Sequence, residues 1–354
     1  MKIKHQFLTI ALLLAFAVSQ AQPKAAANVW SAQKANAWYA RHKWISGANF
    51  TPSTAINQLE MWQADTFDPI TIDRELGWAQ GIGFNTMRVF LHSIAWKEDP
   101  AGFKSRVRQY LDIAGKHHIQ TIFVFFDDCW NADPKPGKQP EPKPGVHNSG
   151  WVQDPGNDIN KPGEYEILHK YVTDVMGTFS HDKRILLWDM FNEPNQNREA
   201  VTMELLSKAF AWARAVNPDQ PLSAGIWDLD QKKLVAFQLA NSDVITYHSY
   251  ETPDKHLALI QRLKKYGRPL ICTEYMARPR NSTFQNTMPM LKRENVGAIN
   301  WGLVTGKTNT KYAWDTPIPD GSEPKLWFHD IFRKDGVLYK QDEGDLIKHL
   351  NGKQ

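Results

Sequence analysis

Two glutamates, Glu193 and Glu274, each end an apolar stretch of the kind that forms a buried strand. Glu193 closes the run Ile-Leu-Leu-Trp-Asp-Met-Phe-Asn-Glu over 185–193, and Glu274 closes Pro-Leu-Ile-Cys-Thr-Glu over 269–274. The first run must stop there, because Pro194 cannot donate a hydrogen bond to a sheet. Ligands bind at the carboxyl ends of parallel strands, so both carboxylates are expected to face one binding site.

Two carboxyl groups that face each other can cleave a glycosidic bond. One group, protonated, donates its proton to the departing oxygen, while the other, ionised, attacks the anomeric carbon. A separation of roughly 5 Å predicts retention of configuration, whereas roughly 6.5 to 9.5 Å leaves room for a water molecule and predicts inversion. Either glutamate alone could be an ordinary salt-bridged acid, but the pair at two strand ends favours catalysis.

The elements that would position this pair alternate along the chain. Seven or eight helical stretches separate eight apolar, strand-like stretches, which begin near residues 44, 84, 120, 185, 221, 243, 269 and 298. This alternation predicts an α/β fold, namely a closed (β/α)8 TIM barrel with long loops on its C-terminal face, rather than an open doubly wound sheet. Glu193 and Glu274 would then end the fourth and seventh strands.

The long loops carry information of their own. Residues 128–162 contain seven prolines, which excludes regular structure over most of that length. Loops this long in a compact domain are usually functional. Together with residues 304–325, this loop is expected to decide whether the cleft accepts the middle of a polymer or is walled off.

The composition argues against several other kinds of protein. The chain has 354 residues and a formal charge of +4, and its basic residues are interleaved with acids, so no nucleic-acid partner is expected. Cys129 and Cys272 belong to non-neighbouring predicted strands and are expected to be free thiols rather than a disulfide. No histidines and cysteines have zinc-site spacing, so neither a metal nor another cofactor is expected. We expect a monomer.

The N-terminus has the pattern of a secretory signal. Residues 1–21 begin with basic residues, continue with an apolar run and end in small residues, so cleavage after Ala21 and a secreted or periplasmic protein are expected. The apolar run is too short to span a membrane, and no longer one follows. Residues 22–43 would form an N-terminal arm or short helix, and residues 44–354 a single catalytic domain.

The sequence around both glutamates resembles a known family. Trp-Asp-Met-Phe-Asn-Glu-Pro over 188–194 looks like the Asn-Glu-Pro signature on strand four of the clan A glycoside hydrolases, and Thr-Glu-Tyr over 273–275 resembles their strand-seven nucleophile segment. The chain is most similar to glycoside hydrolase family 5, which includes cellulases and mannanases. The resemblance implies a retaining β-glycosidase that acts on carbohydrate by double displacement, with Glu193 as acid/base and Glu274 as nucleophile.

Further residues match the family pattern, which implies their roles. Arg88 would lie near Glu274 and keep it ionised. Asn192 would bind the sugar hydroxyl beside the anomeric carbon, an interaction that strengthens in the transition state. Tyr250 would orient the nucleophile, and His248 would bind either the substrate or the acid/base glutamate.

Tryptophans are the expected sugar platforms, because aromatic rings stack on the C–H faces of sugars. Trp301 at the end of strand eight matches the family pattern, and Trp130 and Trp227 are further candidates for substrate binding. About half of the tryptophans expected near the barrel mouth should line the cleft and the others should pack loops: Trp62, Trp96, Trp130, Trp151, Trp227, Trp301 and Trp314.

The sequence departs from the family pattern at strand three. Family members usually carry a histidine shortly after an aspartate there, whereas this chain has Asp-Asp-Cys-Trp-Asn over 127–131. His92, just past strand two, is the candidate to replace that contact. Two other hypotheses stay open: an exo-acting β-glycosidase resembling the catalytic barrels of family 2, and a catalytically inactive, secreted carbohydrate-binding barrel.

Overall fold

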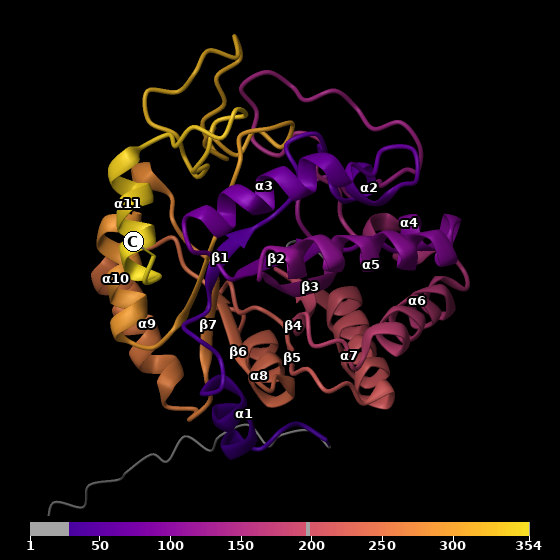
Figure 1. The fold of residues 1–354 in the computed structure, drawn as a ribbon. Coiled ribbons are helices and arrows are strands. Elements are labelled where there is room, and N and C mark those ends of the chain that lie inside the picture. Colours follow the sequence, from indigo (N-terminus) through magenta and orange to yellow (C-terminus); the bar gives the residue numbers. More distant parts are fainter. Residues whose placement is uncertain (1–27, 196–198, 354) are drawn as a thin grey trace, which may run out of the picture.

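The computed structural model describes residues 28–195 and 199–353, so the expected signal over 1–21 lies outside the described residues. Eight parallel strands form one sheet at the centre of the molecule (Figure 1). The strands are β1 Ser46–Asn49, β2 Thr86–Phe90, β3 Gln120–Asp127, β4 Ile185–Asn192, β5 Leu222–Ser223, β6 Ile245–His248, β7 Leu270–Glu274 and β8 Gly297–Asn300.

The sheet closes on itself. Its order is β5-β4-β3-β2-β1-β8-β7-β6, and Ile226 joins the two end strands. The Ile226 N–H donates to the Thr246 carbonyl at 2.9 Å, and the His248 N–H donates to the Ile226 carbonyl at 2.9 Å. The predicted (β/α)8 barrel is therefore confirmed. Strand β5, expected over 221–226, is shorter because the chain leaves β4 after Ser223 to pair with β6.

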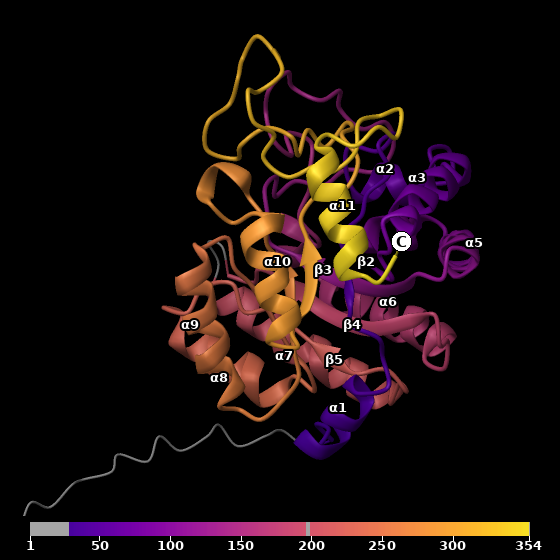
Figure 2. The ribbon, with the colours of Figure 1, turned by 60° about the vertical axis from the view of Figure 1, so that its left-hand side comes forward.

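Helices surround the barrel (Figures 1 and 2). The longer ones turn an apolar stripe inward; α5, for example, buries Phe103, Val107, Tyr110 and Leu111. The α-helices are α1 Ala32–Tyr39, α2 Gln58–Trp62, α3 Pro69–Gly81, α4 Ser93–Glu98, α5 Pro100–Lys116, α6 Glu164–Phe179, α7 Glu199–Val216, α8 Lys232–Asn241, α9 Pro253–Lys264, α10 Phe284–Arg293 and α11 Gln341–Leu350.

Helix α1 closes one end of the barrel. The region expected to be an arm or short helix is helical over the residues of α1, and Trp30 and Trp38 pack into a buried cluster with barrel residues such as Ile122 and Leu186. The Trp30 N–H donates to Asp243 Oδ1 at 2.7 Å, which ties this segment to the start of β6. This end of the barrel is thus filled, and a ligand must enter from the other end.

Two long loops lie at that other end, where the strands finish. The β3–α6 loop covers residues 128–163 and contains the 3-10 helix η1 Gly156–Asn160, and the β8–α11 loop covers 301–340. Figures 1 and 2 show them close together, in magenta and in orange to yellow, opposite α1. Both cysteines are free thiols, as expected. Within the part of the chain that the structure describes, no helix has the length and hydropathy that a membrane span requires.

Candidate active site

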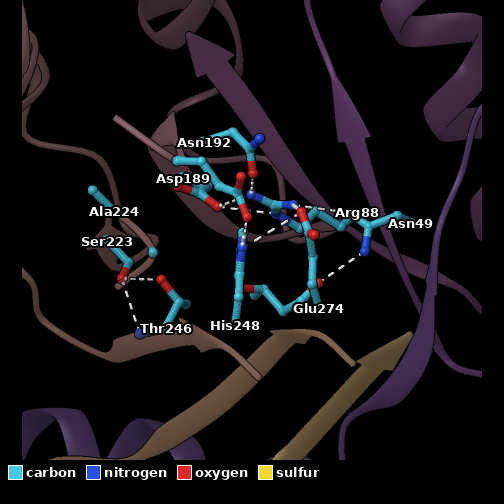
Figure 3. Close-up of polar contacts among 12 residues, drawn as sticks. Asn49, Arg88, Asp189, Asn192, Ser223, Ala224, Thr246, His248 and Glu274 are labelled. Atoms are coloured by element: carbon cyan, nitrogen blue, oxygen red, sulfur yellow. Dashed lines mark hydrogen bonds and ion pairs between the residues drawn. The ribbon is translucent and has the colours of Figure 1, made fainter. Parts of the chain in front are cut away.

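Arg88 of β2 is the centre of the site's floor, and its side chain has no exposed surface (Figure 3). Nε and Nη2 donate to Asp189 Oδ2 of β4 at 3.0 and 2.8 Å. Nη1 donates to Asn49 Oδ1 at 2.9 Å and to Glu274 Oε1 at 3.0 Å, and Nη2 also donates to Asn192 Oδ1 at 2.7 Å. Buried charges must be paired, and here one cation serves two carboxylates.

Glu274 is the last residue of β7, and its side chain is 7% exposed. Its Oε1 binds Arg88, and its Oε2 accepts a hydrogen bond from the Tyr250 hydroxyl at 2.8 Å. Burial raises the pKa of Glu274 above its ordinary value, while the positive charge of Arg88 and the Tyr250 bond act in the opposite direction. Arg88 therefore favours the ionised form, as expected, but it also neutralises Asp189 and does not outweigh burial.

His248 links the two glutamates. The pairing of β6 with β7 shifts between Tyr247 and His248, which sets His248 opposite Glu274. Its Nδ1 lies 2.8 Å from Glu193 Oε1, and its Nε2 lies 3.6 Å from Glu274 Oε1. Burial lowers the pKa of His248 to about 4. Near pH 7 the ring is therefore neutral and has a single N–H to offer the two carboxyl groups.

Glu193 follows β4 with a φ of 41°, a left-handed conformation that residues with a side chain rarely adopt. Such backbone strain occurs preferentially at functional sites. Its side chain is 19% exposed, and its Oε2 accepts a hydrogen bond from the Cys129 thiol at 3.4 Å. One carboxylate oxygen of Glu193, one of Glu274 and a ring nitrogen of His248 all lie within 4.8 Å of one another. The two carboxyl groups can therefore act on the same bound molecule.

A cavity of about 460 Å³ lies above these groups. Its size falls within the range of ligand pockets, roughly 300 to 1,000 Å³. Aromatic rings supply much of its surface, which suits a sugar with apolar C–H faces and polar edges. The lining residues are Cys129, Trp130, His147, Asn148, Trp151, Asn192, Glu193, Trp227, Tyr250, Glu274, Trp301 and Trp314.

The structure brings the residues that were predicted from the sequence to this one place. Arg88 and His248 contact the glutamates from below, and the other predicted site residues line the cavity. Two of the seven candidate tryptophans do not line it. The indole of Trp62 is fully buried and donates to the Phe90 carbonyl at 2.7 Å, and that of Trp96 donates to Asp174 Oδ2 at 2.8 Å.

His92 does not replace the histidine that is missing at strand three. Its Nδ1 accepts from the Ile94 N–H at 3.2 Å as the cap of α4, and its Nε2 lies 3.2 Å from the Gln153 carbonyl. Cys129 instead stands at the end of β3, within hydrogen-bond distance of Glu193 and of Asn192 Nδ2, the latter at 3.4 Å.

Some residues of the site were not predicted from the sequence. Asp189 accepts two hydrogen bonds from Arg88, and Asp127 accepts hydrogen bonds from Asn192 Nδ2 at 2.9 Å and from the Trp151 indole at 2.6 Å. Burial raises the pKa of Asp127 to about 6. Asp189 had a usable signal, because it and Arg88 are the charged residues inside two otherwise apolar strands, and buried opposite charges must pair.

Glu193, His248 and Glu274 are also the group of potential metal ligands found among the described residues. A cation between them would add to the positive charge that Arg88 already supplies. In the structure, the more exposed carboxyl group of Glu193 lies opposite the buried carboxyl group of Glu274, which contacts Arg88. Such a pair can donate a proton and attack an electrophilic carbon.

A protein-family model described as Cellulase (glycosyl hydrolase family 5) matches residues 79–306. No protein with a curated description matches the chain.

Solved structures with the same fold cover most of the chain at low sequence identity. A GH5_18 protein variant from Streptomyces cattleya, in complex with Manb1-4GlcNAc, has a TM-score of 0.60 and 13% identity, with 87% of this chain and 80% of that chain covered. The exo-beta-1,4-mannosidase Op5Man5 from Opitutaceae bacterium strain TAV5 has 0.59 and 17%, with 88% and 59% covered. The beta-mannanase from the blue mussel Mytilus edulis has 0.56 and 14%, with 88% and 93% covered.

Proposed function

Because this chain belongs to glycosyl hydrolase family 5 and is thus a glycoside hydrolase, we propose that it cleaves β-linked oligo- or polysaccharides with retention of configuration. The observation that carries the proposal is the pair Glu193 and Glu274 at the ends of β4 and β7, where one carboxylate oxygen of each lies within 4.8 Å of the other. Retaining enzymes place their two carboxyl groups about 5 to 5.5 Å apart, whereas inverting enzymes need a wider gap for water.

In the first step Glu274 attacks the anomeric carbon, and a covalent bond forms between its carboxylate oxygen and that carbon. Glu193 gives its proton to the glycosidic oxygen as the bond between that oxygen and the anomeric carbon breaks. The Arg88 and Tyr250 bonds hold Glu274 in place and favour the ionised form that attacks. Tyr250 keeps its proton for this bond, because burial raises its pKa well above the ordinary value.

In the second step Glu193, now ionised, takes a proton from water, whose oxygen bonds to the anomeric carbon from the side the leaving group vacated. The ester bond to Glu274 breaks and its carboxylate is restored. The neutral His248 ring beside Glu193 lets that carboxyl change its charge twice in each cycle without a fixed positive charge next to it.

Asn192 is placed to bind the hydroxyl beside the anomeric carbon. Its Oδ1 accepts from Arg88 and its Nδ2 donates to Asp127, so the amide orientation is fixed from both sides. Trp301 and Trp227 both line the cavity and supply apolar surface for stacking with sugar rings.

The test is covalent labelling with 2-deoxy-2-fluoro β-glycosides that carry a dinitrophenolate leaving group, with gluco, manno, galacto and xylo variants. The proposal expects time-dependent inactivation and a peptide mass increase of one fluorosugar on Glu274. Inversion at the anomeric carbon in an NMR time course, or a label on another residue, would refute it. The manno compounds come first, because similar structures are named as a mannosidase and a mannanase.

We also propose that the enzyme is exported, since residues 1–21 have the pattern of a cleavable signal. N-terminal sequencing of the protein from the periplasm or medium of a bacterial expression host should begin after Ala21. An unprocessed protein retained in the cytoplasm would contradict export and leave the catalytic proposal untouched.

A further inference from the structure

The two long loops over the barrel mouth are joined to each other. The Asn148 N–H donates to the Thr308 carbonyl at 2.8 Å, and the Ile318 N–H donates to the Gly145 carbonyl at 3.0 Å. His147 Nδ1 lies 2.9 Å from the Tyr312 carbonyl. The backbones approach so closely that a side chain at Gly145, where φ is 66°, would collide with the carbonyl of Ile318.

The β1–α3 connection is attached to both of these loops. The Asn57 side chain donates to the Gly150 carbonyl of the β3–α6 loop at 2.8 Å. Lys307 of the β8–α11 loop forms an ion pair with Glu60 at 2.6 Å, and its N–H donates to the Ser53 carbonyl at 3.1 Å. Three connections that follow β1, β3 and β8 therefore form one continuous structure around part of the mouth.

The side chains that this structure turns to the cavity form a wall, defined here as His147, Asn148, Trp151 and Trp314. Its members support one another: the rings of His147 and Trp314 lie with centroids 6.3 Å apart, and Trp314 lies 4.8 Å from Tyr250 beyond β6. His147 and Trp151 are buried and Trp314 is partly buried, so this boundary of the cavity is packed rather than open.

The wall stands across the barrel from the acid/base candidate. In the closed strand order, β8 is diametrically opposite β4, and Trp151 of the wall packs on Trp301 just after β8, with ring centroids 5.7 Å apart, while Trp314 lies beside Tyr250, which follows β6. Glu193 follows β4, and Trp227 follows β5 beside it, where the Trp227 indole donates to the Pro194 carbonyl at 2.9 Å. The acid must face the glycosidic oxygen, so the leaving group lies on the side of Glu193 and Trp227 and the glycone lies toward the wall.

From this arrangement, and resting on the proposed function, we propose that the wall closes the glycone end of the cavity after one sugar unit. The enzyme then removes single sugars from the non-reducing ends of β-linked oligosaccharides and does not cut within a polymer. The substrate class is the free, non-reducing terminal β-glycosyl residue.

The polar groups of the wall favour such an end. His147 donates its Nδ1 proton to the Tyr312 carbonyl, and burial lowers its pKa to about 4, so its Nε2 is unprotonated and can only accept. Asn148 Oδ1 is a second acceptor, buried and without a partner among the described residues. A terminal sugar has free hydroxyls to donate, whereas an internal sugar has replaced one of them with a glycosidic bond. A buried acceptor left without a donor costs binding free energy.

The experiment compares 4-nitrophenyl β-glycosides of a single sugar with the corresponding aryl β-1,4-disaccharides, in the sugar series that the enzyme accepts. The expected first products from the aryl disaccharide are a monosaccharide and the aryl monoglycoside, so nitrophenol appears only after a lag. An intact disaccharide released together with nitrophenol from the first turnover would overturn the proposal.

A variant tests whether the wall is the cause. Trp314→Ala should raise direct release of the intact disaccharide, relative to monosaccharide release, by about tenfold or more, as expected when a pocket gains room for a larger group. Val337→Ala is the matched control, since Val337 belongs to the same loop but is 56% exposed. An unchanged product ratio in a folded Trp314→Ala protein would count against the wall.

Different results would contradict the proposed function and the inference about the wall. If no aryl glycoside is cleaved and no fluorosugar labels Glu274, the proposed function itself is wrong. If Glu274 is labelled but internal bonds are cut first, retaining hydrolysis stands and the inference about the wall falls.

Discussion

The two catalytic candidates are the same residue type in two different environments. Glu274 is buried, and it receives hydrogen bonds from a permanent cation, Arg88, and from a hydroxyl, Tyr250. These partners lie on β2 and beyond β6, so the carboxylate is held from two directions. A group in this position suits a nucleophile, which must stay ionised and aligned with the anomeric carbon.

Two neutral groups contact Glu193. Its oxygens face His248, whose ring is uncharged near neutral pH, and the Cys129 thiol, which keeps its proton because burial raises its pKa well above the ordinary value. It is also the more exposed of the two glutamates. A group that must gain and lose a proton in every cycle is suited to neutral contacts, because a cation held against it would favour one charge state, and this contrast supports Glu193 as the acid/base and Glu274 as the nucleophile.

The largest effects are expected when either glutamate is removed. Glu274→Ala is expected to lower kcat by about 10⁵-fold on every substrate, as the loss of a nucleophile does. Glu193→Ala should cost about 10² to 10⁴-fold with poor leaving groups, the usual contribution of general acid catalysis, and much less for bond cleavage with dinitrophenolate.

Azide distinguishes the two variants by stereochemistry. It should intercept the glycosyl enzyme in Glu193→Ala and give a β-glycosyl azide, whereas in Glu274→Ala it should replace the nucleophile and give the α-glycosyl azide. NMR of the products decides between them. Azides of the opposite configuration would mean that the two roles are exchanged.

The second largest effect is expected at Arg88. Arg88→Met leaves Asp189 and Glu274 buried without their cation, which should destabilise the fold by about 3 to 5 kcal/mol. Urea unfolding at two pH values measures this loss of stability and its pH dependence. The unpaired carboxyls will have folded-state pKa values above their unfolded ones, so the folded variant binds more protons and should regain stability as the pH falls toward 5.

A double variant provides the control for Arg88. Arg88→Met with Asp189→Asn removes one of the two unpaired charges and should recover part of the lost stability without recovering activity, because Glu274 still lacks its partner. Equal destabilisation of the single and double variants would show that burial of the charges is not what makes Arg88 necessary.

The contrast between the two glutamates also shows which features of the site could be predicted from the sequence and which could not. Strand-ending carboxylates at 193 and 274 and the alternation of strands and helices depend on local patterns, and these predicted the barrel and the pair. The side chains that make the surroundings of Glu193 and Glu274 different come from distant parts of the sequence. Cys129 meets Glu193 across 64 positions, and only the fold shows that contact.

The wall was the least predictable part, for a physical reason. His147 and Asn148 lie in a proline-rich loop with no periodicity, and hydrogen bonds to the backbone of another loop fix their positions. Such contacts leave no pattern in the residue types. The sequence could therefore predict that a long loop shapes the cleft, but it could not predict where in the barrel mouth the side chains of that loop lie.

A smaller effect is expected when Tyr250, a partner of Glu274, is changed, and it concerns the pH dependence of kcat/KM. Activity requires ionised Glu274, so kcat/KM should fall as the pH drops through its pKa, which burial raises above the ordinary glutamate value. Tyr250→Phe removes a donor to the ionised form, so the acid limb should move to higher pH by about 1 to 2 units, the worth of a charged hydrogen bond. An acid limb that stays in place while kcat falls would assign Tyr250 to substrate binding alone.

The smallest effect is expected on the Glu193 side, at Cys129. Cys129→Ala removes a neutral donor to Glu193 and should lower kcat by about three- to tenfold with alkyl leaving groups, which matches a hydrogen bond of about 0.5 to 1.5 kcal/mol. With dinitrophenolate as leaving group the loss should vanish, since the first step then needs little acid assistance. Cys129→Ser, which keeps a donor, should restore most of the activity. A loss that is equal for all leaving groups, or no rescue by serine, would mean that Cys129 only fills space, and the strand-three departure would then have no part in proton transfer.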